Sequence, residues 1–125
     1  MPNYNLAVFL NAVEGKEKEF NEWYEVHHVP DALSLPGMKA GQRFKAGPEY
    51  MGQSAPCKYM AFYEIEAPSL DDAIAIFTDG TAKFYVSDAV DLASVHAYPL
   101  TPITEKFSSS EQARKTGKAK YGVAA

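Results

Sequence analysis

The sequence has 125 residues, of which 46% are hydrophobic and 13% aromatic, with one cysteine and a formal net charge of -4. This length and composition predict one globular domain with its own core. The excess of acidic residues disfavours nucleic-acid binding, because a protein that neutralises phosphates needs a basic surface. A single cysteine excludes an intramolecular disulfide, and no apolar run reaches the roughly 20 residues of a membrane span. We therefore expect a cytoplasmic protein that binds neither nucleic acid nor membrane.

Hydrophobic periodicity predicts the elements of the first half of the chain. Residues 3–11 carry apolar side chains on both alternating faces, which predicts a strand covered on both sides. Residues 14–28 carry an apolar stripe with helical spacing. Pro30 is expected to end this helix, because proline lacks the N–H and clashes with the preceding turn. The turn signal Pro36-Gly37 precedes a second predicted strand over residues 38–46.

The second half of the chain begins with a predicted loop over residues 47–56. A strand over residues 58–66 follows, then a helix over residues 70–82 that Ser69 caps, and then a fourth strand within residues 91–103. Residues 1–104 therefore form the predicted domain. Residues 105–125 show little hydrophobic periodicity, and we expect a tail that is mobile or wraps around a partner.

The order strand, helix, strand, strand, helix, strand predicts an α+β, ferredoxin-like βαββαβ fold with a four-stranded antiparallel sheet. Two helices cover only one face of such a sheet, yet the predicted strands are apolar on both faces. A second copy of the same sheet would cover the other face. We therefore expect a homodimer whose two sheets form a closed or nearly closed barrel.

Several motifs carry a resemblance to the EthD-like branch of the dimeric α+β barrel superfamily. They are Asn21-Glu22-Trp23-Tyr24, His28-Val29-Pro30-Asp31, Leu35-Pro36-Gly37, Gln42-Arg43-Phe44 and a third strand over residues 59–65. The resemblance covers roughly residues 4–103 and implies a cytoplasmic homodimer with a pocket between helices and sheet in each subunit. The wider superfamily includes cofactor-free monooxygenases, cyclases, dehydratases, isomerases and haem-degrading enzymes, so the fold alone does not select a reaction.

His28 matches the histidine of that family, and an imidazole with an ordinary pKa near 6.5 can take or give a proton near neutral pH. Asp31 could hold this imidazole in one tautomer. The competing interpretation is that His28 only stabilises the end of the helix dipole. Helical spacing places His27, and not His28, nearer the middle of the apolar face as a packed or substrate-contacting side chain. The two criteria disagree, and we follow the family's histidine.

Five further side chains complete the candidate site. Trp23 and Tyr24 fit the apolar face of the helix and could wall a pocket, although core packing is the commoner role. Arg43 is expected to clamp a carboxylate or a developing enolate oxygen, the alternative being a solvated or interface cation. Tyr63 and His96 on the inner strands are the remaining substrate-binding candidates.

These residues predict a cofactor-independent enzyme with lyase, dehydratase, cyclase or isomerase chemistry on a small aromatic or enolisable carbonyl compound. His28 would transfer the proton, Asp31 would orient it, and Arg43 would hold a substrate oxygen. The alternatives are a cofactor-free or haem-degrading monooxygenase and a non-catalytic small-ligand-binding or stress-response dimer. A metal centre built from the three histidines and Asp31 is a rival that we do not predict, because adjacent histidines point to different sides of a helix.

Overall fold

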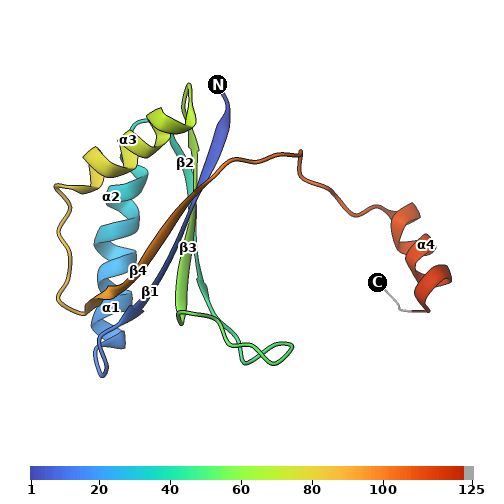
Figure 1. The fold of residues 1–125 in the computed structure, drawn as a ribbon, viewed down its shortest axis with the longest axis horizontal. Helices are drawn as coiled ribbons and strands as arrows, with labels where there is room; N and C mark the ends of the chain where they lie inside the picture. The colour runs from blue at the N-terminus through green and yellow to red at the C-terminus, as the bar shows by residue number, and fades with distance from the viewer. Residues whose placement is uncertain (123–125) are drawn as a thin grey trace.

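The computed structural model describes residues 1–122 and has two layers, a sheet and the helices that cover one of its faces (Figure 1). The strands are β1 (Asn3–Ala12), β2 (Met38–Lys45), β3 (Tyr59–Glu66) and β4 (Val90–Leu100). Their order across the sheet is β2-β3-β1-β4, and every neighbouring pair is antiparallel. The predicted ferredoxin-like α+β arrangement is confirmed.

The helical layer is formed by two segments. The first runs through α1 (Glu17–Trp23), a π-helical turn η1 (Tyr24–His28) and α2 (Val29–Leu33), and the second is α3 (Leu70–Thr81). The predicted cap of α3 is confirmed, because Ser69 Oγ accepts a hydrogen bond of 3.1 Å from the Asp72 backbone N–H. Within residues 1–122, no helix combines the length and the apolar character that crossing a membrane requires.

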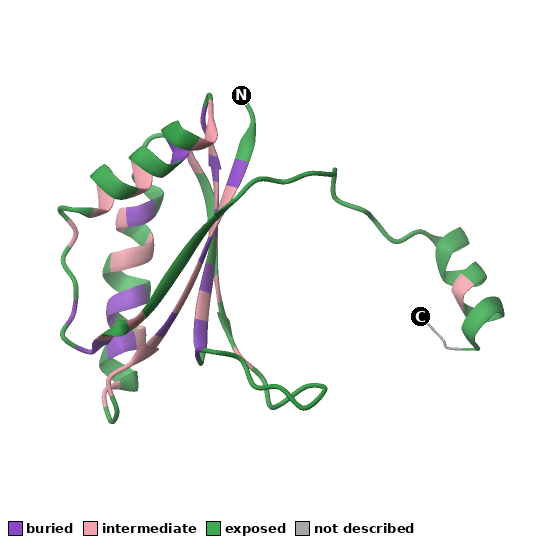
Figure 2. Cartoon of the chain, viewed as in Figure 1, coloured by how far each residue is buried: buried purple, intermediate pink, exposed green. Residues whose placement is uncertain are grey.

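The core lies between the helices and the two central strands, where the buried residues of β1 and β3 gather (Figure 2). Phe20 of α1 and Tyr24 of η1 are almost fully buried, and their rings meet edge to face at 5.6 Å. Tyr59 of β3 lies 5.1 Å from the Phe20 ring. Aromatic pairs of this kind stabilise by about 0.5–1.5 kcal/mol beyond the burial of their area. The core therefore holds the helical segment with His27 and His28 against the central strands.

The first helical segment does not end at Pro30, contrary to the prediction from the sequence. The chain stays helical to Leu33 because the turn before the proline widens, and the Val29 N–H donates to the Tyr24 carbonyl five residues earlier. A wider turn accommodates a proline within a helical segment, because the proline ring needs space and offers no N–H. Pro30 lies in the first turn of α2, where a missing N–H costs least.

The wide turn also changes which histidine faces inward. It holds about one residue more than an α-helical turn, so the residues after it shift by about one position around the helix. His28 therefore takes the inward position that an unbroken α-helix would give to His27, and His27 is exposed. The placement of His27 on the apolar face, predicted from α-helical spacing, is wrong for this reason.

Within residues 1–122, no helix lies over the other face of the sheet (Figure 1). It presents Phe44, Phe62, Tyr98 and Leu100, each between 36% and 52% exposed. The rings of Phe44 and Phe62 meet edge to face at 5.6 Å, and those of Phe9 and Tyr98 at 5.9 Å. The apolar pattern on both sides of the strands is thus confirmed, and this open face leaves a group of aromatic side chains uncovered.

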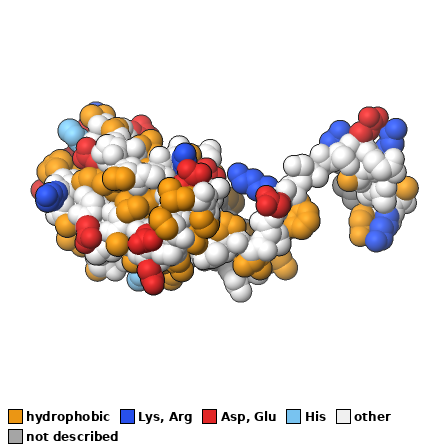
Figure 3. Space-filling view, turned by 90° about the horizontal axis from the view of Figure 1, so that it is seen from above, with side chains coloured by type: hydrophobic (Ala, Val, Ile, Leu, Met, Phe, Trp, Pro, Cys, Tyr) orange, Lys and Arg blue, Asp and Glu red, His pale blue; other side chains and the backbone are white. Residues whose placement is uncertain are grey.

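Beyond β4 the chain leaves the sheet on the side away from the helices and ends in α4 (Glu111–Tyr121) (Figures 1 and 3). The connecting arm, residues 101–110, exposes Ile103 and Phe107 by 93% and 92%. The helix α4 was not predicted from periodicity, since it has no buried residue. Its start is marked by Ser110, whose Oγ accepts from the Ala113 N–H at 3.0 Å. Residues 123–125 of the predicted tail lie outside the described residues.

Gly37 of the predicted turn gives a test of the packing of β2 on β3. Its φ of +84° is unfavourable for other residues, and a Cβ added there would collide with the backbone carbonyl oxygen of Glu66. We expect Gly37→Ala to lower the free energy of unfolding by about 2–3 kcal/mol in urea denaturation. The control is Gly47→Ala, where a Cβ meets nothing within 4 Å and the change should stay within about 1 kcal/mol. Equal effects of the two substitutions would contradict this account.

Candidate functional site

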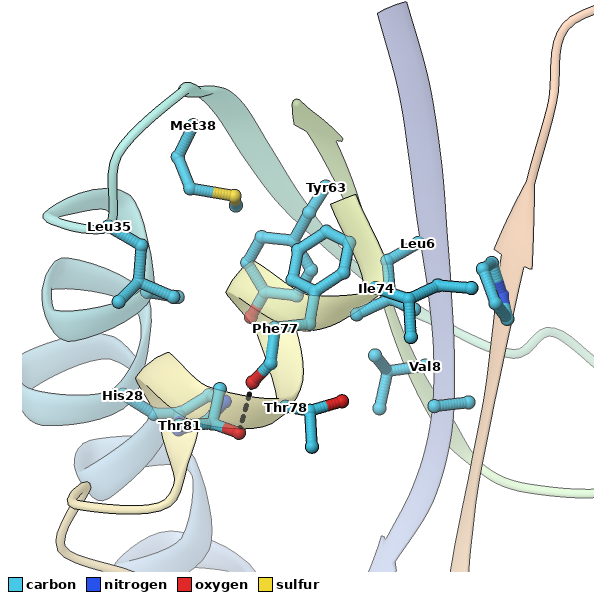
Figure 4. A pocket seen from close by; sticks show the side chains of 13 residues that line it. Leu6, Val8, His28, Leu35, Met38, Tyr63, Ile74, Phe77, Thr78 and Thr81 are labelled. Atoms are coloured by element: carbon cyan, nitrogen blue, oxygen red, sulfur yellow. Dashed lines mark hydrogen bonds between the residues drawn. The ribbon is translucent and has the colours of Figure 1, made fainter. Parts of the chain in front are cut away.

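A cavity of about 380 Å³ lies between α3, the end of the first helical segment and the sheet (Figure 4). Its wall is apolar except for four side chains, His28, Tyr63, Thr78 and Thr81. None of the thirteen described side chains that line it is Asp, Glu, Lys or Arg. Its size is at the lower end of the range typical of small-molecule sites, and its wall has the expected composition, mostly apolar with a few polar groups.

His28 enters this cavity from the helical side and is held by three aromatic rings. Its imidazole lies 4.8 Å from the Trp23 ring, 5.0 Å from the Tyr24 ring and 5.8 Å from the Phe84 ring. Trp23 is fixed in turn, because its indole N–H donates to the Tyr85 carbonyl at 3.0 Å. The imidazole therefore has a defined orientation although no hydrogen bond within residues 1–122 holds it.

The Nδ1 atom of His28 is buried and has no hydrogen-bond partner among the described residues. Burial lowers the pKa of this imidazole, and the negative charge of Asp31 opposes the shift without reversing it. His28 is therefore neutral at pH 7, with one nitrogen free to accept a proton or a hydrogen bond. An unpaired buried polar atom costs free energy in a native structure, so this atom calls for a ligand or for water.

Two buried tyrosines continue the polar side of the site. The hydroxyls of Tyr24 and Tyr63 also have no hydrogen-bond partner within residues 1–122. The two hydroxyls lie close enough for each to affect the pKa of the other, although their geometry falls short of a hydrogen bond. Burial is the main cause that raises the pKa of each phenol. Tyr63 lines the cavity, and Tyr24 lies directly behind it against His28.

Asp31 lies on α2 and influences His28 only through its charge. No hydrogen bond joins its carboxylate to the imidazole in the described part of the chain, and its backbone carbonyl accepts from Ser34 Oγ at 2.6 Å. The structure therefore does not show the orienting contact expected from the sequence. Its carboxylate remains near enough to favour the protonated form of His28.

The structure does not bring Arg43 to the cavity. Its guanidinium donates to Asn21 Oδ1 at 2.7 Å and to Glu25 Oε1 at 3.1 Å, and it lies 4.4 Å from the centre of the Tyr24 ring. Only 16% of its side chain is exposed. In the sheet Arg43 lies opposite Ala61 of β3, whereas Gly41 lies opposite Tyr63. Arg43 is thus beside α1, whose Asn21 it contacts. Arg43, the expected substrate clamp, is therefore bound by side chains of α1 and η1.

The other two histidines lie away from His28 and from each other. His27 is exposed and its ring meets Tyr85 at 5.7 Å, outside the cavity wall. His96 pairs with Phe9 across β1 and β4, on the open face of the sheet. Within residues 1–122, no group of three or more His, Cys, Asp or Glu side chains is arranged to hold a metal ion.

Sequence reasoning missed the contribution of α3 to the site. This helix supplies Ile74, Phe77, Thr78 and Thr81, and the Thr81 hydroxyl donates to the Phe77 carbonyl (Figure 4). The sequence signal for this contribution was the presence of Thr78 and Thr81 among the apolar positions of the helix. Ile74 borders the cavity and is 36% exposed.

Comparison with known proteins identifies the fold. No protein-family model matches the sequence, and no curated protein matches it. Among solved structures, an EthD family protein from Bacillus halodurans aligns over 82% of this chain and all of its own, with 15% identity and a TM-score of 0.52. A proposed monooxygenase from Shewanella loihica aligns over 85% of this chain and 97% of its own, with 11% identity and a TM-score of 0.51.

A third structure is a single-residue mutant of MhuD with two manganese protoporphyrin IX molecules bound per active site. It aligns over 86% of this chain and all of its own, with 11% identity and a TM-score of 0.52. At these identities the likeness establishes the fold and leaves the reaction open. The chain thus shares the ferredoxin-like α+β fold of an EthD family protein, in agreement with the resemblance of its motifs.

Proposed function

We propose that this chain is an enzyme that uses neutral His28 to move a proton on a small apolar molecule. The observation that carries the proposal is the buried Nδ1 atom of His28, which has no partner within residues 1–122 and belongs to a side chain that lines an apolar cavity. A histidine that acts as a general base must be deprotonated, and so neutral, at the working pH, and it must reach the proton that it takes. Burial provides the first condition, and the cavity provides room for the second.

The reaction class that fits is proton removal next to a carbonyl group. When His28 takes the proton, the electron pair of the broken C–H bond moves toward the carbonyl oxygen and an enolate forms. The Tyr63 hydroxyl has no hydrogen-bond partner within residues 1–122 and belongs to a side chain of the cavity wall, and it would donate a hydrogen bond to that oxygen. Asp31 favours the imidazolium that results. The proton can then return to another carbon of the substrate, or a leaving group can depart.

Oxygenation is the second candidate, because structures with this fold include a proposed monooxygenase and MhuD. Its first step can be the same deprotonation, after which the enolate or phenolate reacts with dioxygen in place of a proton. The two candidate reactions differ in whether turnover requires dioxygen. Turnover that stops when dioxygen is removed supports oxygenation, and turnover that continues supports proton transfer.

We also propose that the working form is a homodimer that pairs through the open face of the sheet. The aromatic group of this face would pack against the same group of a second copy, as two sheets do in a sandwich. The charge of the tail, residues 105–125, supports a second copy of this chain as the partner on the open face. Residues 1–104 hold fourteen acidic and seven basic side chains, whereas residues 105–125 hold two acidic and five basic. The basic tail leaves on the side where an acidic second copy would lie (Figure 1).

The proton-transfer proposal predicts that the enzyme exchanges the α-protons of 2-tetralone, an apolar enolisable ketone, for deuterium in D₂O. We expect His28→Gln to slow this exchange by roughly 100- to 10,000-fold, because a positioned general base contributes about that much. His27→Gln is the matched control and should exchange at the wild-type rate, since His27 is outside the cavity. Proton NMR follows the loss of signal. A folded His28→Gln enzyme with the wild-type rate would refute the proposal.

The lowered pKa of His28 predicts a pH dependence of stability. Between the folded-state pKa and the unfolded value of about 6.5, the unfolded chain binds more protons than the folded one. The free energy of unfolding should therefore fall as the pH drops through this window, and His28→Gln should lose that part of the slope. Urea denaturation of both proteins from about pH 8 to about pH 5 measures it. Parallel curves for the two proteins would show that His28 keeps an ordinary pKa.

The dimer proposal predicts that a charge on the open face separates the subunits. We expect wild-type protein to sediment as a dimer and Phe62→Lys to sediment as a monomer, because an unpaired charge in an apolar interface is costly. The control is Val26→Lys, which alters an exposed apolar side chain on the helical layer and should leave the dimer intact. A wild-type monomer in sedimentation velocity at micromolar concentration would overturn the proposal.

A further inference from the structure

The described side chains that line the cavity include hydrogen-bonding groups but no Asp, Glu, Lys or Arg. His28 and Tyr63 contribute buried polar atoms without partners within residues 1–122, and Thr78 adds a hydroxyl to the wall. Neither of the two aromatic groups is ionised at neutral pH, since burial lowers the pKa of His28 and raises that of Tyr63. A ligand therefore meets uncharged polar side chains, His28, Tyr63, Thr78 and Thr81, in an otherwise apolar space.

The cation whose charge acts on Tyr63, Arg43, does not offer a counter-charge to a ligand. Arg43 is bound by Glu25 and Asn21 and lies against the Tyr24 ring, outside the cavity wall. Its charge lowers the pKa of Tyr63 less than burial raises it. A carboxylate placed in the cavity would lose hydration without gaining an ion pair, which disfavours its binding.

We propose that the cavity selects uncharged aromatic compounds that carry a hydroxyl or carbonyl oxygen, and that it rejects the corresponding carboxylates. A hydroxyl group suits either side chain, because it can both donate a hydrogen bond and accept one. This match also holds for either tautomer of His28, since a hydroxyl both donates and accepts. The volume of about 380 Å³ accommodates a compound of two fused rings. The inference rests on the proposal that this cavity is the functional site.

The test compares 2-naphthol with 2-naphthoate, which share a ring system and differ in charge. In isothermal titration calorimetry with the full chain at pH 7, we expect 2-naphthol to bind roughly 100-fold more tightly, because the buried charge is unpaired. Tyr63→Phe should weaken 2-naphthol binding about tenfold through loss of one hydrogen bond and should leave naphthalene binding unchanged. Tyr98→Phe, on the open face, is the matched control and should change neither affinity.

Two results would overturn the inference. One is 2-naphthoate binding as tightly as 2-naphthol, and the other is no binding of 2-naphthol at millimolar concentration. The deuterium exchange of 2-tetralone separates this inference from the proposed function. A preference for 2-naphthol with an unchanged exchange rate in His28→Gln would keep the ligand class and reject the proton transfer. Tight binding of 2-naphthoate with a slowed exchange rate in His28→Gln would reject the ligand class and keep the proton transfer.

Discussion

The candidate site depends on one wide helical turn, Tyr24–His28. Pro30 lies two residues beyond it, in a helical segment that continues to Leu33. The wider turn takes up the proline and shifts the following residues around the helix, which brings His28 instead of His27 under α3. Turns of this kind are frequent at functional sites, because they reposition one side chain while the helix continues. The position of the imidazole is thus a consequence of backbone geometry.

The surroundings of His28 then determine its protonation. Three aromatic rings orient the imidazole, and its Nδ1 atom has no hydrogen-bond partner within residues 1–122. Burial disfavours the charged form, and the Asp31 carboxylate limits how far the pKa falls. A base that is neutral at rest, with a carboxylate near enough to stabilise its protonated form, is suited to a reversible proton transfer. The same burial makes the site selective against charge.

Much of the fold could be predicted from the sequence, and the site only in part. The alternation in β1 and β3 and the Ser69 cap are local signals, so the order of elements and the two-sided apolar sheet were predictable. The inward histidine was not predictable from periodicity, because a wide turn breaks the 100° spacing on which that argument rests. Arg43 was misplaced because its partners, Asn21 and Glu25, come from a helix whose position against β2 is a property of the tertiary fold.

The two faces of the sheet separate the site from the surface proposed for pairing. Successive residues of β1 alternate between them: Leu6 and Val8 line the cavity, whereas Phe9 meets Tyr98 on the open face. The central strands therefore contribute side chains to both surfaces. The backbones of β1 and β3 are hydrogen-bonded to a neighbouring strand on each side. The proposed pairing would cover the open face, and the cavity lies on the opposite face of the sheet. The side chains that line the cavity in this chain all come from one subunit.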